Sequence, residues 1–339
     1  MSWYTDIGNK NDIIISTRVR IARNIKHFPF APKLSPENAE KIISLVWDSL
    51  APVAKDFSLH RIDKLSPVKQ QVLIEKHLIS PNLTGNFPRA AIINKDETIS
   101  IMVNEEDHIR IQCLSAGFAP DEAWETASRI DDLIGESLEY AFHDKFGFLT
   151  SCPTNTGTGV RISAMVHLPA IAVSGRISGL LSQAVKSGMT VRGLYGEGTD
   201  AQGNFYQISN QITLGFSEEE LIERFNRIVS SVCEVEKKLR TELSKNVPVK
   251  LQDRILRSYG LMRHAYMMSG KEFLNFLSDV RLGIYLGILK PIPLQKLTSL
   301  MVTTMPAMIS GNLPLSAEER DLKRSKIIKE TLFKGDDIL

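Results

Sequence analysis

The segment Ser16-Thr17-Arg18-Val19-Arg20-Ile21-Ala22-Arg23-Asn24 carries the most information about the fold of this chain. Apolar residues alternate with arginines between positions 18 and 22, and this alternation predicts a β-strand. In a strand, Arg18 and Arg20 point to the same face of the sheet. Two neighbouring cations repel each other unless an anion lies between them. Taken alone, the segment is explained most simply as a solvated strand face.

The segments around it predict a mixed α+β domain over residues 1–240 and an all-helical domain over residues 241–339. Strands are expected at 90–93, 98–103, 160–167 and 205–214, and helices at 120–143 and 175–186. Ser217 and Glu220 form a capping box at the start of a long helix. This helix crosses the expected boundary, so it could belong to both domains.

The overall charge is almost balanced. The 339 residues include 41 Lys and Arg against 39 Asp and Glu, so the formal net charge is 41 − 39 = +2. A protein that coats nucleic acid usually has a basic surplus, so direct nucleic-acid binding is not expected. The total does not exclude a local basic site.

The chain shows no feature of a secreted or membrane protein. Its N-terminus lacks an apolar signal segment, and no run of eighteen apolar residues occurs. Cys113, Cys152 and Cys233 are few and unpaired in sequence, which fits a reducing compartment. No Cys/His cluster has the spacing of a zinc site. We therefore expect a cytoplasmic protein without membrane contact.

The common phosphate-binding loops are missing. The sequence has no GxxxxGK[ST] motif, no GxGxxG motif and no HRD or DFG motif of protein kinases. A protein with this sequence must therefore bind phosphates in another way, if it binds them at all.

Three further segments are unusual when they are read beside the first. They are NEEDHIR at 104–110, CPTNTGTGVR at 152–161 and VRGLYGEGT at 191–199. Each has a plain structural interpretation: an exposed acidic turn, a buried structural thiol, and a surface loop with unpaired charges. Glycines in the second segment would also let the backbone approach a ligand closely.

Together, the four segments resemble the phosphagen (guanidino) kinases, in the same order and with similar spacing over about residues 12–240. The family motifs are STRVR, NEEDHLR, CPSNLGTGLR and the RGT-GE region that precedes YDISN. The resemblance implies an antiparallel sheet flanked by helices. The likeness is greatest to the bacterial protein arginine kinases, because the chain begins almost at STRVR and ends in a similar helical extension.

The resemblance implies transfer of the γ-phosphoryl group of ATP, with Mg²⁺, to a guanidinium nitrogen of an arginine side chain. No protein residue is assigned to the metal. Arginines would take the place of a phosphate loop, since guanidinium groups bind phosphate oxygens in pairs. The residues implied around the nucleotide are Ser16, Thr17, Arg18, Val19, Arg20, His77, Arg110, Arg161, Ile162, Ser163, Ala164, Met165, Arg192, Gly193, Leu194, Tyr195, Gly196 and Glu197.

The implied catalytic residues are Glu106, Glu197, Cys152 and Arg192. A guanidinium is cationic and a poor nucleophile at neutral pH, because its pKa is about 12.5–13.8. Carboxylates that bind it can orient it and accept a proton. The family pattern selects Glu106 for this role over its acidic neighbours, and Cys152 would help to position the substrate.

A second site is implied near the C-terminus. Glu319-Arg320-Asp321-Leu322-Lys323-Arg324-Ser325 resembles the RDxxRA motif of a phosphoarginine pocket, with Ser325 in place of Ala. Arg320 and Arg324 lie on one side of a helix and could hold a phosphate, while Asp321 would receive a guanidinium. Without the resemblance, a surface helix with salt bridges explains the segment.

The resemblance also implies partners. These are arginine-bearing protein substrates, a Clp protease or chaperone, a heat-shock repressor, a zinc-binding activator protein and a second copy of the chain in a dimer. Two alternative functions are a kinase for free arginine or another small guanidino compound, and an inactive adaptor that binds phosphoarginine.

Overall fold

The computed structural model describes residues 2–193 and 201–333. Its main element is an antiparallel sheet with the strand order β2-β3-β4-β5-β1-β8-β10-β9. The strands are β1 (Ile14–Arg23), β2 (Phe57–Arg61), β3 (Ala90–Asn94), β4 (Ile99–Val103), β5 (Ile109–Ala116), β8 (Val160–His167), β9 (Met189–Gly193) and β10 (Phe205–Asn210). A small hairpin contains β6 (Phe142–His143) and β7 (Gly147–Phe148). The segment with alternating arginines is therefore a strand near the centre of the sheet.

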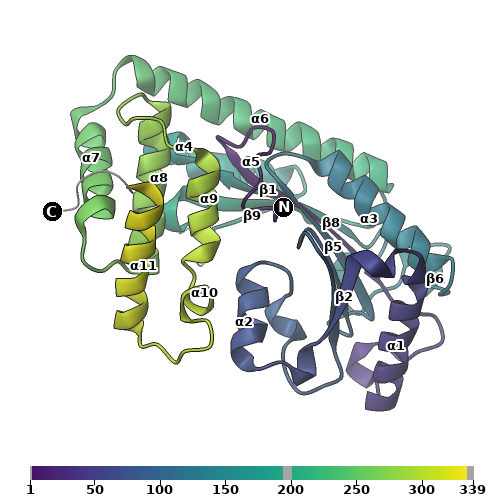
Figure 1. Cartoon of the computed structure of the whole chain (residues 1–339). Helices are drawn as coiled ribbons and strands as arrows, with labels where there is room; N and C mark the ends of the chain where they lie inside the picture. Colours follow the sequence, from purple (N-terminus) through teal and green to yellow (C-terminus); the bar gives the residue numbers. More distant parts are fainter. Residues whose placement is uncertain (1, 194–200, 334–339) are drawn as a thin grey trace.

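One face of the sheet is covered by helices α1 (Pro36–Ser49), α3 (Pro120–Gly135), α4 (Pro169–Val173), α5 (Ile177–Lys186) and α6 (Glu218–Lys245). The longest of them, α6, crosses the molecule beside α3 (Figure 1). Ser217 and Glu220 form the predicted capping box at its start. Val19, Ile21 and Ile162 point from the sheet into this apolar layer and are fully buried.

The other face is only partly covered. The C-terminal helices are α7 (Val249–His264), α8 (Gly270–Tyr285), α9 (Leu294–Thr303), α10 (Pro306–Ser310) and α11 (Ala317–Leu332), and they gather at one end of the sheet (Figure 1). They share a second apolar cluster with Met165 and Phe205 of the sheet. Helix α2 (Pro67–Glu75) packs against α10. The predicted antiparallel sheet with flanking helices and a helical C-terminal part is confirmed.

The prediction of a helix over 120–143 is wrong at its end, because α3 stops at Gly135. Tyr140 then pairs with Ile25 in an isolated bridge, and Ala141 N donates to Asn24 O at 2.7 Å. Pairing with the end of β1 thus replaces further helical hydrogen bonds. Helix α6 passes residue 240 without a break, and its Leu243 packs against both apolar clusters.

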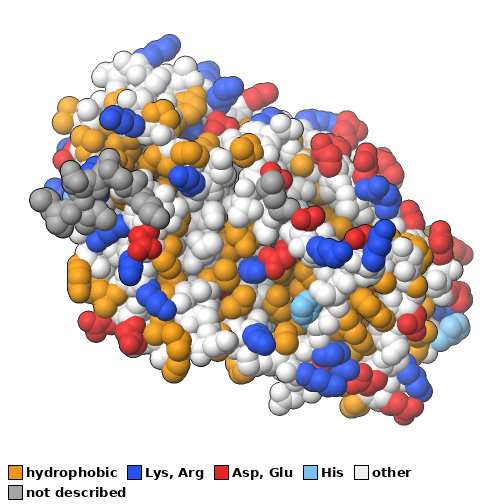
Figure 2. Space-filling view, viewed as in Figure 1, with side chains coloured by type: hydrophobic (Ala, Val, Ile, Leu, Met, Phe, Trp, Pro, Cys, Tyr) orange, Lys and Arg blue, Asp and Glu red, His pale blue; other side chains and the backbone are white. Residues whose placement is uncertain are grey.

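The surface agrees with the balanced composition. Figure 2 shows Lys and Arg side chains interspersed with Asp and Glu over the face in view, without a broad region of one sign. No helix in the described part of the chain is long and apolar enough to cross a membrane.

A buried ionic cluster connects α6 to the sheet. The Glu236 carboxylate accepts hydrogen bonds from Ala170 N and Ile171 N at 3.0 and 2.9 Å, and from Arg240 Nε at 2.7 Å. Arg240 also donates to His167 O at 3.1 Å. Glu236 and Arg240 are almost fully buried, so Glu236 depends on Arg240 for charge compensation, and Arg240 depends on Glu236 and on the more distant Asp12, at 3.9 Å.

We predict that Glu236→Ala lowers the free energy of unfolding by about 3–5 kcal/mol, because it removes the buried carboxylate 2.7 Å from Arg240 and leaves Asp12, 3.9 Å away, as the acidic partner of that buried charge. Urea denaturation of the full chain measures the change. Glu234→Ala is the matched control, because Glu234 lies on the same helix and is exposed. Equal midpoints for the two variants would contradict the prediction.

Candidate active site

Five arginines predicted to bind phosphates lie on four strands, the adjacent β5, β1 and β8 and the outer strand β9, and the strand register brings them to one face of the sheet. Arg20 on β1 lies opposite Arg161 on β8, and Ala22, two residues further along β1, lies opposite Arg110 on β5. Direct cross-strand partners share a face, as do residues two apart. On the outer strand β9, Arg192 lies opposite Gln207. Gln207 in turn lies opposite Met165.

These arginines destabilise one another's charge. Burial and the nearby charges of Arg161 and Arg110 lower the pKa of Arg18 to about 10. Burial and the same kind of repulsion lower the pKa of Arg20 well below its ordinary value. Among the described residues, no group accepts a hydrogen bond from Nε of Arg20 or Nε of Arg161, although both atoms are buried. Buried donors without acceptors, surrounded by like charge, favour binding of a polyanion.

A cavity of about 240 Å³ lies at one end of this face. It is lined by Arg20, Ala22, Glu106, Arg110, Cys152, Thr154, Asn155, Gly159 and Arg161. The cavity therefore joins three of the predicted phosphate-binding arginines to two of the predicted catalytic residues. Ala22 was not predicted, but its spacing of two residues from Arg20 could have identified it.

The two neighbouring glutamates have different surroundings. The Glu105 side chain is fully buried and lies 2.6 Å from Arg110 Nη1, and it also accepts a hydrogen bond from Ser80 Oγ at 2.6 Å. The Glu106 side chain is half-buried, faces the cavity and lies 2.9 Å from Arg110 Nη2. Glu105 thus holds Arg110 in place, while Glu106 remains accessible to a substrate.

The Cys152 loop is fixed by tight backbone packing. Gly157 and Gly159 both have positive φ angles, of 117° and 68°. A Cβ on Gly157 would lie 2.4 Å from Thr213 O, and one on Gly159 would lie 2.6 Å from Ala22 O. These glycines therefore allow the loop to pack closely against the rest of the chain. Gly159 also lines the cavity, and its close approach to a ligand there stays a prediction. The Cys152 thiol lies 3.0 Å from the Thr154 hydroxyl.

A narrower cavity of about 70 Å³ continues along the sheet. It is lined by Ser16, Arg18, His77, Leu114, Ser163, Met165 and Gln207. Five of these residues were predicted to bind the nucleotide. Leu114 and Gln207 were missed, because only the register of β5 and β10 brings them beside the others.

His77 enters this cavity from the end of α2. Its φ angle is 62°, and His77 N and Leu78 N donate to Ile74 O and Leu73 O, each at 2.9 Å. This is the Schellman arrangement, in which the left-handed position is usually a glycine. Burial and the charge of Arg18 lower the pKa of His77 to about 4, so the ring is neutral at pH 7.

Other predicted nucleotide residues lie elsewhere. The side chains of Val19, Ile162 and Ala164 belong to the apolar layer on the opposite face, and Thr17 Oγ1 donates to Gly117 O at 2.7 Å. Strand alternation explains this placement, which directs these side chains away from the arginines. Gly193 ends β9 opposite Tyr206. Leu194, Tyr195, Gly196 and Glu197 lie outside the described residues.

The predicted phosphoarginine residues lie at the start of α11. Arg324 is buried, and it donates to Thr304 O at 3.0 Å and to Met268 O at 2.8 Å, and also binds the Asp321 carboxylate. Ser325 Oγ donates to Ala265 O at 2.6 Å. Arg320 donates to the nearby Leu315 O. Arg324 and Ser325 therefore connect α11 to neighbouring loops in this structure.

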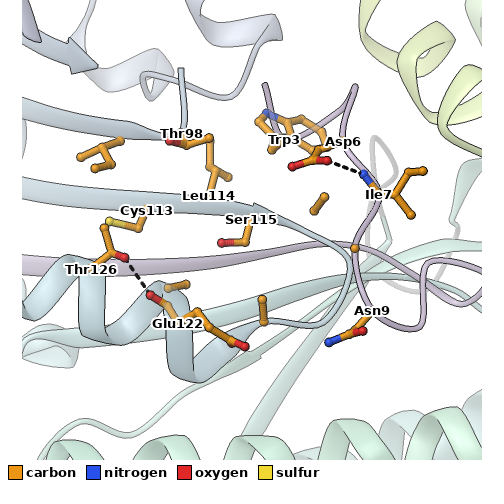
Figure 3. Close-up of a pocket in the computed structure, with 15 residues that line it drawn as sticks. Trp3, Asp6, Ile7, Asn9, Thr98, Cys113, Leu114, Ser115, Glu122 and Thr126 are labelled. Carbon is orange, nitrogen blue, oxygen red and sulfur yellow. Dashed lines mark hydrogen bonds between the residues drawn. The ribbon is translucent and has the colours of Figure 1, made fainter. Parts of the chain in front are cut away.

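A cavity of about 400 Å³ lies at the end of β5 (Figure 3). Trp3 on its rim packs against His77, with ring centroids 5.3 Å apart. The charged side chains among its lining residues are Asp6 and Glu122, and both are acidic. This charge disfavours a triphosphate, so the arginine face suits a nucleotide better than this larger cavity.

Comparison with known proteins agrees with this geometry. The family model for the C-terminal catalytic domain of ATP:guanido phosphotransferases matches residues 38–239, and that for the protein-arginine kinase McsB C-terminal domain matches residues 248–337. A protein-arginine kinase from Caldanaerobacter subterraneus is 46% identical over 95% of this chain and 98% of its own length. The chain belongs to the protein-arginine kinase family. It is therefore a phosphotransferase that uses ATP.

Other relatives and solved structures are consistent with this membership. The protein-arginine kinase of Bacillus subtilis is 43% identical over 98% of this chain and 93% of its own length. A crystal structure of lombricine kinase matches with a TM-score of 0.62 and 24% identity, and the match covers 73% of both chains. A taurocyamine kinase from Schistosoma mansoni also has a TM-score of 0.62 at 24% identity, over 77% of this chain and 38% of its own. The last two matches show a shared fold.

We predict that His77 makes the folded kinase sensitive to acid. The pKa of the ring is about 4 in the folded chain and about 6.5 in the unfolded chain, so between these values only the unfolded chain takes up the proton. The contribution of His77 to the free energy of unfolding is close to zero above pH 6.5. At pH 5 it lowers this free energy by about 2 kcal/mol. Urea denaturation of wild type and His77→Asn at pH 7.5 and pH 5 measures the difference.

Asparagine is chosen because it tolerates a positive φ angle and does not titrate. The control is His27→Asn, because His27 is exposed. We expect the loss of stability at pH 5 to be smaller in His77→Asn and unchanged in His27→Asn. The same loss in both variants would show that His77 does not titrate as described.

Proposed function

We propose that this protein transfers the γ-phosphoryl group of ATP to the guanidinium group of arginine side chains in other proteins. The observation that carries the proposal is the partly buried arginine face with two buried, unpartnered Nε atoms, which opens into the cavity that contains Glu106 and Cys152. Membership of the protein-arginine kinase family supports the choice of acceptor.

Arg18, Arg20, Arg110, Arg161 and Arg192 would bind the phosphates and stabilise charge on the transferring group. Phosphoryl transfer depends mainly on such positioning and charge neutralisation. The narrow cavity beside Ser16, His77 and Met165 would hold the rest of the nucleotide. No group of three or more His, Cys, Asp or Glu residues in the described chain could hold a metal ion. Mg²⁺ would therefore be bound by phosphate oxygens and water.

Glu106 and Glu197 would bind the acceptor guanidinium from two sides. In the transfer, a guanidinium nitrogen forms a bond to the γ-phosphorus, the bond from that phosphorus to the oxygen of ADP breaks, and a guanidinium proton passes to a carboxylate. Cys152 lies in the same cavity as Glu106 and would help to position the guanidinium. It forms no covalent intermediate in this scheme.

We predict that Glu106→Gln lowers kcat by about 10²–10⁴-fold, because the amide can orient a guanidinium but cannot accept its proton. The assay uses ATP, Mg²⁺ and an arginine-bearing protein, with mass spectrometry under conditions that preserve the P–N bond. Glu125→Gln, at an exposed position on α3, is the control. Full activity in Glu106→Gln, or in Glu197→Ala, would contradict the proposed roles.

The same assay separates the alternative functions. A kinase for small guanidino compounds would phosphorylate free arginine better than a protein. A phosphoarginine-binding adaptor would give no transfer at all. The proposed function predicts acid-labile phosphoarginine on the protein and much less on free arginine.

Several finer proposals accompany this function. Arg320, Asp321, Arg324 and Ser325 would form a phosphoarginine pocket in a C-terminal domain that begins near residue 241. The kinase would act in the cytoplasm as a dimer, be stimulated by a zinc-binding activator protein, phosphorylate a heat-shock repressor and mark proteins for a Clp protease. Family resemblance supports these proposals.

A further inference from the structure

A second groove lies beside the Cys152 loop. Its volume is about 480 Å³, and it is formed by the end of α5, the residues that follow β10, and one side chain of α6. Thr154 lines both this groove and the cavity that contains Glu106 and Cys152. The groove and the cavity that contains Glu106 and Cys152 therefore meet at Thr154.

The groove and the reaction centre also share a rigid support. Thr213, on the segment that follows β10, donates its hydroxyl to Thr154 O at 3.0 Å and to Thr156 O at 2.8 Å. Thr158 N donates back to Thr213 O at 3.1 Å. Because these bonds join the groove wall to the Cys152 loop, a ligand in the groove has a fixed position relative to the cavity.

The wall of the groove combines polar residues with exposed apolar side chains. The side chains that contribute most are Val185, Ile212 and Leu214, which are 57%, 46% and 49% exposed. Single apolar residues on a surface are common, but three that line one groove are typical of a binding surface.

The charges at the groove all have one sign. Lys186 and Arg224 line it, and none of its lining residues is acidic. Neither cation forms an ion pair with another described residue. Arg224 lies over the Phe216 ring at 5.2 Å, a contact that limits the directions it can take. The groove therefore favours an occupant that has apolar groups and negative charge.

We propose that this groove binds the polypeptide on one side of the target arginine and selects segments with acidic and apolar side chains. The inference rests on the proposed function and makes it more specific. When the guanidinium of a target arginine lies in the Glu106 cavity, the main chain of the substrate must leave over the rim. The groove begins at Thr154 on that rim. A free amino acid has no flanking chain to occupy it.

The test uses the full chain, ATP and three peptides of equal length with a single arginine. In the first peptide, the residues on both sides of the arginine are acidic and apolar. In the second they are neutral and polar, and in the third they are basic. We expect wild type to give a kcat/KM about tenfold higher for the acidic peptide than for the basic one. The double variant Lys186→Glu with Arg224→Glu should reverse this order and leave the KM for ATP unchanged.

The matched control is Lys237→Glu with Lys238→Glu, which makes the same charge change at exposed positions of α6 outside the groove. It should keep the wild-type order of peptides. A separate variant, Leu214→Ser, tests the apolar wall. It should raise the KM for the acidic and apolar peptide several-fold without a change in kcat.

Failure of this inference differs from failure of the proposed function. If wild type phosphorylates the three peptides equally, or if the control reverses the order as well, the groove does not select substrates. If Lys186→Glu with Arg224→Glu changes the oligomeric state in size-exclusion chromatography and not the order of peptides, the groove contacts a second copy instead. If wild type forms no phosphoarginine on any peptide, the proposed function itself is overturned.

Discussion

Repulsion among partly buried arginines on one face of the sheet is the constraint on which the candidate site depends. Arg18, Arg20 and Arg161 lie close together on the face of a central sheet, where burial and like charge both lower their pKa values. Such a face is unfavourable in a protein that does not bind anions. The fold tolerates this arginine face because the opposite face of the same strands lies in a large apolar layer. In addition, the buried Glu105 carboxylate lies beside Arg110 and compensates its charge. A bound polyanion would relieve this repulsion, so the arginine face of the sheet favours an anionic ligand.

Much of this arrangement of arginines could be predicted from the sequence. Alternation in β1 was enough to place Arg18 and Arg20 on one face, and the capping box correctly marked the start of α6. The family resemblance then added Arg110 and Arg161. The sequence could not show that Arg161 lies directly opposite Arg20, because register depends on pairing between strands far apart in the chain.

Other features depended on contacts that no local pattern predicts. Helix α3 ends early because Tyr140 and Ala141 pair with the end of β1, a tertiary interaction. In the Cys152 loop, Gly157 packs against Thr213 O and Gly159 packs against Ala22 O, and both partners lie more than fifty residues away in the chain. The family resemblance selected Glu106 over Glu105, but the sequence did not show that the Glu105 side chain is fully buried beside Arg110 while that of Glu106 faces the cavity.

Helix α2 contacts both the C-terminal helices and the narrow cavity. Its last residue, Glu75, is buried and accepts hydrogen bonds from Ala307 N and Met308 N of α10, each at 2.9 Å. Two residues later, His77 lines the narrow cavity beside Arg18. The Schellman turn between them is short and hydrogen-bonded, so the positions of Glu75 and His77 are fixed relative to each other. Helix α2 is therefore a direct structural connection between the C-terminal helices and the cavity beside Arg18.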